Sequence, residues 1–236
     1  MSLCRSYRLL LLVLISPILI SACSPFVTST PPPSPQPIQV AFTPTLSPLV
    51  ERLQQCALQQ PEIALVTQEM SVTGLDFVGT DLTLWLGEPP QEPSSYAFSL
   101  GVDEIVVIAG ANVALRELDA QQLQDLYTNA NSTYQMWTYG QGHELRALFD
   151  QVLFGENSIP YHAKLTPDPA GMIEALTTDP MAVGYIPSSW LEQGIQTISL
   201  DGDLQTAFEQ PILALTHTEP VGNLHKYLVC LQTSSR

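Results

Sequence analysis

Apolar residues recur along the chain in short blocks, some with the two-residue period of a strand and others with the period of a helix. Alternating or continuous apolar runs predict strands, at residues 38–42, 62–68, 82–86, 105–109, 181–186 and 212–216. Helical spacing predicts helices, at residues 48–58, 120–127, 143–154, 169–178 and 221–232. Short strands separated by helices of about ten residues are typical of an α/β fold with mostly parallel sheets and flanking helices.

Three of the predicted helices start with recognisable capping residues. Asp119 and Gln122 have the spacing of a capping box, in which each side chain bonds the backbone N–H of the other residue. Ser47 precedes Pro48, which predicts an N-cap followed by a proline whose missing N–H costs nothing. The pair at residues 168–169 is also an acceptor followed by proline.

The first 22 residues have the pattern of a secretory signal. Arg5 and Arg8 precede an apolar run at residues 9–20, which is too short for a comfortable membrane span. The four residues that end at Cys23 read Ile-Ser-Ala-Cys, which resembles the bacterial lipobox. The resemblance implies that residues 1–22 are removed and that Cys23 is lipidated. A plain signal anchor with an incidental cysteine is the alternative.

Residues 23–37 comprise the lipidated cysteine and a proline-rich tether. Six of the 20 prolines fall within residues 24–37, and such a stretch favours extended polyproline geometry and builds no core. Acyl chains on Cys23 would hold the protein at a membrane. The sequence therefore predicts a protein anchored by lipid to the cell membrane, on its extracellular or periplasmic face.

The charge of the chain is sparse and mostly negative. Residues 1–22 contain two of the 8 Lys+Arg residues and no acid, so the rest of the chain keeps 6 basic against 23 acidic residues, a net charge of -17. No run of Lys or Arg offers the basic patch that nucleic acid requires, so we expect no nucleic-acid partner. If an anion binds, local N–H groups must hold it against the overall field.

Cys56 and Cys230 are the cysteines that follow Cys23. Both fall on predicted helices with apolar neighbours, in a compartment that permits disulfides. Either they form a disulfide that closes a long loop, or they are two buried free thiols.

Sequence motifs of common enzymes are absent. The chain has no G-x-S-x-G, no H-E-x-x-H and no P-loop, and its four His, at 143, 162, 217 and 225, lack the spacing of metal ligands. We therefore expect no enzymatic activity, no cofactor and no metal. A hydrolytic carboxylate pair is the enzymatic alternative that the 23 acidic residues leave open.

Four local motifs follow one another along the chain. They are Ala41 to Leu49 (AFTPTLSPL), Leu118 to Tyr127 ahead of Trp137, Arg146-Ala147-Leu148-Phe149, and Ala182-Val183-Gly184-Tyr185-Ile186. In this order they resemble phosphate-type (PstS-like) solute-binding proteins of ABC transporters, in class II of the periplasmic binding protein superfamily. The resemblance covers most of residues 38–232. It implies two lobes joined by crossover strands around a ligand cleft, with lobe one at 38–98 plus 188–236 and lobe two at 99–187.

The resemblance also implies a function. The chain would be a monomeric solute-binding protein that presents a small oxyanion such as phosphate, or another small polar ligand, to an ABC permease. The implied ligand-binding residues are Thr43, Thr45, Asp81, Tyr139, His143 and Arg146. Each of these residues also has a structural interpretation, as a cap, a turn residue or, for Tyr139, packing within the lobe.

Two departures from the family pattern support an alternative function. The family's Ser-Gly-Thr at the helix start is His143-Glu144-Leu145 here, and the Glu144 carboxylate would repel a bound phosphate. The glycine-rich turn after the second strand shrinks to residues 71–74. The alternative is a degenerate binding fold that acts as a sensor or envelope interaction domain without transport. A pair between Glu144 and Arg146 would favour it, whereas a bidentate contact of Arg146 with an anion would favour transport.

Overall fold

The computed structural model describes residues 34–72, 79–88, 96–155 and 162–234. The signal segment 1–22, Cys23 and the tether up to residue 33 lie outside these ranges. The chain divides into the units Met1–Ser34 and Pro35–Arg236, and the fold is that of the second unit. Within the described ranges no helix combines the length and the apolar character needed to cross a membrane.

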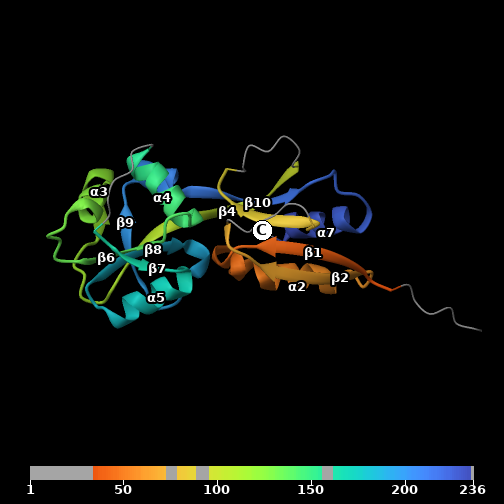
Figure 1. The fold of residues 1–236 in the computed structure, drawn as a ribbon, viewed down its shortest axis with the longest axis horizontal. Coiled ribbons are helices and arrows are strands. Elements are labelled where there is room, and N and C mark those ends of the chain that lie inside the picture. The colour runs from red at the N-terminus through yellow and green to blue at the C-terminus, as the bar shows by residue number, and fades with distance from the viewer. Residues whose placement is uncertain (1–33, 73–78, 89–95, 156–161, 235–236) are drawn as a thin grey trace, which may run out of the picture. The chain divides into compact units, whose positions relative to one another are not determined.

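Residues 35–236 form a mixed sheet with helices on its faces (Figure 1). The strands are β1 Gln36–Phe42, β2 Ile63–Glu69, β3 Leu82–Leu86, β4 Tyr96–Ala109, β5 Glu117–Leu118, β6 Gln135–Tyr139, β7 Lys164–Thr166, β8 Ala182–Pro187, β9 Gln196–Leu200 and β10 Glu209–Thr216. The helices are η1 Pro44–Leu49, α2 Val50–Leu58, α3 Ala120–Thr128, α4 Glu144–Phe154, α5 Pro169–Thr178, η3 Ser188–Trp190, α6 Gly202–Ala207 and α7 Gly222–Thr233. The strand order is β2-β1-β3-β10-β4-β8-β6-β7, with β9 and β5 branching from β4.

The first lobe is built on β1, which pairs in parallel with β2 on one side and β3 on the other. Helices α2 and α7 pack against each other over this sheet, and Tyr227 donates a hydrogen bond from its hydroxyl to the Leu53 carbonyl (2.9 Å). A disulfide joins Cys56 of α2 to Cys230 of α7. The disulfide interpretation is therefore confirmed, and the bond ties the last helix to the first.

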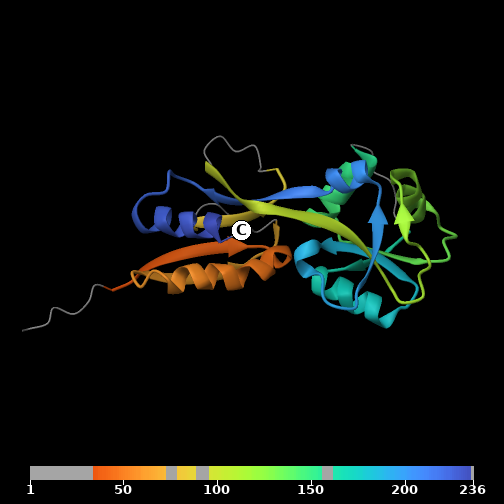
Figure 2. The same ribbon diagram turned by 180° about the vertical axis from the view of Figure 1, so that it is seen from behind.

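Two long strands connect the lobes. Strand β4 pairs antiparallel with β10 over its first half and with β8 and β9 over its second half. Figure 2 shows β4 and β10 running together from the first lobe into the second. Among the described residues, every antiparallel pairing involves β4 or β10, while the pairings among the other strands are parallel. The predicted two-lobe α/β fold is confirmed, with a sheet that is mixed because of the crossing strands.

The second lobe packs around an aromatic core. The rings of Phe149 and Tyr185 stack with centroids 3.8 Å apart, and Phe208 lies 5.4 Å from Phe149. Strand β8 is buried along its whole length, and a Cβ at Gly184 would overlap Met172 of α5. The family-like motif at residues 182–186 is therefore explained by helix-to-strand packing.

The boundary between the lobes differs from the expected one. The resemblance implies that lobe one resumes at residue 188, but β9 pairs with the second half of β4 and with β5. Only β10, which begins at Glu209, returns to pair with β3. The chain after β8 thus completes the second lobe before it crosses back.

The predicted helix caps are confirmed with one exception. Asp119 and Gln122 form both bonds of the capping box (2.8 and 3.0 Å), and Asp168 accepts from the Gly171 N–H (2.8 Å). The prediction that Ser47 is an N-cap is wrong. The chain begins to coil at Pro44, so the Ser47 hydroxyl donates back to the Pro44 carbonyl (2.8 Å) instead.

Candidate functional site

A cavity of about 250 Å³ lies where the end of β1 meets the start of α4. We call it the inter-lobe cavity, because its walls come from both lobes. The first lobe contributes Thr43, Pro44, Ser71 and Val72, and the second contributes Gln141, Gly142, His143, Glu144 and Pro167. Larger hollows of about 440 and 410 Å³ lie on the second lobe, and neither is lined by a residue that the sequence predicts for the ligand site.

Thr43 brings the first lobe to this cavity. It follows directly after β1, the strand flanked by β2 and β3, and only 1% of its surface is exposed. Its hydroxyl Oγ1 donates a hydrogen bond of 2.5 Å to Oε1 of Glu144. Thr43 and Glu144 are 101 residues apart in sequence, so this bond joins the two lobes.

Glu144 is the first residue of α4 and is a buried carboxyl, 7% exposed. Burial raises the pKa of Glu144, and the hydroxyls of Thr43 and Thr45 lower it by a smaller amount. The second oxygen, Oε2, is buried without a hydrogen-bond partner among the described residues. The side chain is thus held by one strong contact and is otherwise poorly satisfied.

Thr45 lies behind Thr43 and is fully buried. Its carbonyl accepts a 2.7 Å bond from the indole N–H of Trp190. Its hydroxyl lies near enough to lower the pKa of Glu144, but it meets hydrogen-bond geometry with no described residue. Two buried polar atoms, Thr45 Oγ1 and Glu144 Oε2, therefore have unused hydrogen-bonding capacity.

His143 caps α4 and is held as a neutral ring. Its Nδ1 accepts from the Leu145 N–H (3.2 Å), and its ring stacks on Tyr139 with centroids 4.3 Å apart. Burial lowers the pKa of His143 to about 4, although the charge of Asp168 acts in the opposite direction. Since Nδ1 is an acceptor, the ring proton of the neutral form is on Nε2.

Tyr139 packs its ring face against the ring of His143. Its hydroxyl donates to the Tyr185 carbonyl (2.8 Å), and the pKa of Tyr139 is raised well above its ordinary value, chiefly by burial. Its hydroxyl is engaged in the core of the second lobe, and its ring face positions His143. Tyr139 does not line the inter-lobe cavity.

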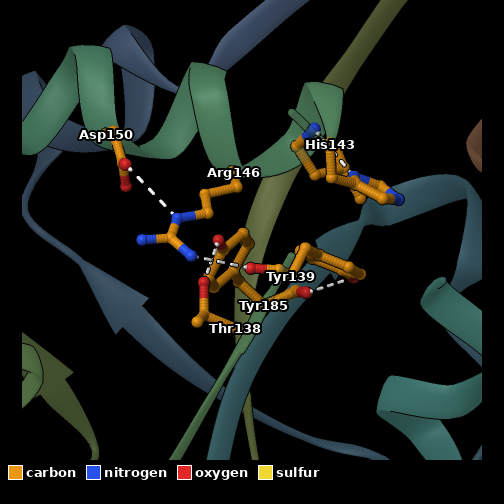
Figure 3. Close-up of polar contacts among 7 residues, drawn as sticks. Thr138, Tyr139, His143, Arg146, Asp150 and Tyr185 are labelled. Atoms are coloured by element: carbon orange, nitrogen blue, oxygen red, sulfur yellow. Dashed lines mark hydrogen bonds and ion pairs between the residues drawn. The ribbon is translucent and has the colours of Figure 1, made fainter. Parts of the chain in front are cut away.

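Arg146 extends toward Tyr139 and Asp150 (Figure 3), and it does not line the cavity. Its guanidinium donates to the Tyr139 carbonyl (3.1 Å), and its Nε lies 3.5 Å from a carboxylate oxygen of Asp150. Residues two apart on a helix point in nearly opposite directions, so Arg146 and Glu144 do not face each other. The interpretation that Arg146 pairs with Glu144 is therefore wrong.

Asp81 also lies apart from the cavity. It precedes β3 and is exposed, and its Oδ2 accepts from the Gln39 N–H (2.8 Å). The β1–β3 register pairs Val40 with Leu82, so Asp81 lies level with Gln39. Thr43 is four residues further along β1, roughly 13 Å away at the usual rise of a strand. The structure thus places Asp81 at the start of β3, beside the middle of β1 and away from the cavity.

The structure adds residues that the candidate set omits. Ser71 and Gln141 line the cavity, and Glu144 makes its central contact. The glycines on either side of Gln141, just before the cap of α4, are a turn signal that could have indicated it. Among the described residues, no group of three His, Cys, Asp or Glu could hold a metal ion.

The comparisons with known proteins identify the fold. No protein-family model and no curated protein sequence matches this chain. A structure from Clostridium perfringens, assigned as a phosphate ABC transporter substrate-binding protein with bound phosphate, is similar with a TM-score of 0.72 at 14% identity, over 83% of this chain and 92% of that one. An ABC-type phosphate transport receptor from Vibrio cholerae is similar with a TM-score of 0.62 at 13% identity, over 85% of this chain and 95% of that one.

Regulatory proteins share the same fold. A full-length OxyR variant from Pseudomonas aeruginosa gives a TM-score of 0.66 at 16% identity, over 86% of this chain and 70% of that one. The CcmR regulatory domain of Synechocystis in complex with 2-PG gives a TM-score of 0.66 at 14% identity, over 85% of this chain and 97% of that one. Both classes of neighbour have periplasmic-binding-protein-like folds, and residues 35–236 adopt that two-lobe α/β fold.

Proposed function

We propose that this chain is a lipid-anchored binding protein that takes a small polar ligand into the inter-lobe cavity outside the cell membrane. The observation that carries the proposal is the meeting of polar side chains from both lobes in one cavity, Thr43 from the first and His143 and Glu144 from the second. In two-lobe folds of this kind, a ligand that contacts both lobes stabilises the closed form.

The cavity limits the size of the ligand. A water molecule occupies about 30 Å³ of liquid, so a cavity of about 250 Å³ suits a compact molecule with few heavy atoms. Small oxyanions and small organic acids have that size. The neighbour from Clostridium perfringens carries phosphate, which supports an oxyanion ligand. Glu144 must be protonated or withdrawn when such an anion enters, because the negative charge of its carboxylate would repel the charge of the anion.

The sequence of the first 37 residues supports the anchor and the partner. The lipobox-like ending at Cys23 and the proline-rich tether suit a binding lobe pair held near the membrane. In this proposal the protein delivers its ligand to an ABC permease in that membrane, as a monomer and without a cofactor or enzymatic activity. Replacing Cys23 by Ala should move the protein from the membrane fraction to the soluble fraction, and unchanged fractionation would contradict the anchor.

A sensor without transport is the second candidate. The observation that favours it is the Thr43–Glu144 bond, through which the chain's own carboxyl already joins the lobes. The OxyR and CcmR neighbours are regulatory proteins with the same fold. In a sensor the cavity would report a ligand or a partner and would deliver nothing.

A thermal-shift screen tests ligand binding. Phosphate, sulfate, molybdate and small organic acids are added to the purified chain, and at least one is expected to raise the melting temperature as binding to the folded state requires. Thr43→Val, which removes the hydroxyl at the cavity, should abolish that shift. Asp81→Asn, beside the middle of β1 and away from the cavity, is the matched control and should retain it. No shift with any of these compounds would contradict the proposed binding function.

A further inference from the structure

Glu144 occupies the position expected for a ligand that contacts both lobes. It projects from the start of α4 in the second lobe, and its carboxyl contacts the hydroxyl that follows β1 in the first lobe. It also lines the inter-lobe cavity together with residues of both lobes. The carboxyl of Glu144 therefore makes the lobe-to-lobe contact that a bound ligand would otherwise supply.

The Glu144 carboxyl leaves buried hydrogen-bonding atoms unpaired among the described residues of its surroundings. Thr43 Oγ1 donates to Oε1, whereas Oε2 and the Thr45 hydroxyl are buried with no hydrogen-bond partner among the described residues. A buried polar atom without a partner costs free energy, commonly about 1–3 kcal/mol. The Glu144 carboxyl is bonded by Thr43, whereas the Thr45 hydroxyl lies near enough to lower the pKa of Glu144 without reaching hydrogen-bond geometry. An untethered carboxylate is free to rotate until both hydroxyls donate to it.

We propose that Thr43 and Thr45 form a carboxyl-binding site, that Glu144 is its built-in occupant, and that a ligand with a free carboxylate enters by displacing Glu144. The inference rests on the proposed function for the location of the ligand site. It adds the ligand's chemical class and identifies Glu144 as the residue that sets its affinity.

The built-in occupant acts as a tethered competitor. A ligand can bind only to the fraction of molecules in which Glu144 has left the site, so its apparent affinity falls in proportion to that fraction. With a vacated state populated at about 1–10%, removing the competitor raises the apparent affinity about 10- to 100-fold.

Removal of the competitor with acetate as the probe tests this inference. Acetate binding to the purified chain is measured by calorimetry for the wild type and for Glu144→Ala, and Glu144→Ala is expected to bind at least about tenfold more tightly. Glu51→Ala is the matched control, since Glu51 is an exposed glutamate in the first turn of α2 whose side chain accepts a hydrogen bond from Gln55 in the same helix. It should bind acetate as the wild type does.

A second substitution locates the bound acetate. Thr43→Val added to Glu144→Ala should return acetate affinity to the wild-type value, because it removes the donor. If Glu144→Ala does not fold, Glu144→Ser is used, since serine is well accepted at a helix start. Acetate affinity that is equal in the wild type and in the folded Glu144 variant would overturn the inference. Methylammonium binding that requires Glu144 would also overturn it.

The two proposals fail separately. If a compound in the thermal-shift screen stabilises the wild type but loss of Glu144 leaves acetate affinity unchanged, ligand binding stands and the built-in occupant is refuted. If acetate binds only the Glu144 variants and nothing in the screen binds the wild type, the built-in occupant stands and the proposed function is refuted.

Discussion

The two lobes face the cavity with different chemistry. The first lobe lines the cavity with Thr43 and Ser71, whose hydroxyls do not ionise near neutral pH. The second lobe presents His143 and Glu144, whose pKa values are moved in opposite directions by burial. Among the described residues that line the cavity, the ionisable ones are His143 and Glu144 at the start of α4, while Thr43 in the turn after β1 carries no charge. A protein built in this way can change its ligand preference through one helix start.

The lobes also differ in what stabilises them. The first lobe is closed by the disulfide between α2 and α7. The second lobe has no disulfide among its described residues and relies on stacked rings, with Phe149 between Tyr185 and Phe208. Covalent closure in one lobe and aromatic packing in the other predict separate responses to mutation and to reduction.

Loss of the central ring should have the largest effect. Phe149 is fully buried, so Phe149→Ala is expected to lower the free energy of unfolding by about 3–5 kcal/mol, through lost burial and a cavity. Urea denaturation measures this loss of unfolding free energy. Leu58→Ala, at an 84% exposed position in the first lobe, is the control and should change stability by less than about 0.5 kcal/mol. Equal effects of the two substitutions would contradict the assigned core.

Loss of the disulfide should come next and should act on the first lobe. Replacing Cys56 and Cys230 together by Ala is expected to cost about 2–5 kcal/mol, because a closure between residues 174 apart restricts the unfolded chain strongly. Hydrogen exchange should accelerate in α2 and α7 and remain slow in β8. Equally faster exchange in both lobes would show that the lobes do not respond separately.

The pH response of stability should come from the second lobe. The pKa of His143 falls from 6.5 to about 4 on folding, so the neutral ring favours the folded state. This contribution is complete above pH 6.5 and is lost as the pH falls from 6.5 to 4, because the unfolded state takes up the proton first. Allowing for partial exposure of the ring, the loss is of the order of 2 kcal/mol.

The variant His143→Asn isolates this effect, since Asn also caps a helix and does not titrate. Unfolding free energies of wild type and variant are compared from about pH 7.5 to about pH 4.5, and the wild type should lose more. Glu144 acts in the opposite direction, because its raised pKa favours folding at low pH. This contribution is present in the wild type and in His143→Asn alike, so it cancels in the difference between their unfolding free energies. Parallel curves would contradict the buried neutral His143.

The sequence predicts the fold best where the pattern is local. The caps at Asp119 and Asp168 depend on neighbours three residues away and are confirmed. The first half of β4 is missed. Its large apolar residues, at 96, 98, 100 and 102, do alternate with small or polar ones, but the strand is fixed by pairing with β10, more than 100 residues later. The placement of β9 is missed for the same reason, since strand partners that distant leave no local signal.

The candidate site is predictable only in part. Thr43 and His143 are both found at the cavity, and the family resemblance supplied them. Helical periodicity alone places Glu144 and Arg146 on different faces of α4, so their separation could have been foreseen. The contact between Glu144 and Thr43 could not, because a bond across 101 residues depends on how two lobes come together.

A double-mutant cycle tests whether the bond between Thr43 and Glu144 holds the lobes together. The free energy of unfolding is measured for wild type, Thr43→Val, Glu144→Ala and the double variant. Residues in contact show coupling of about 0.5–3 kcal/mol, and we expect a value in that range that favours the native pair. Additive effects, within about 0.3 kcal/mol, would contradict it.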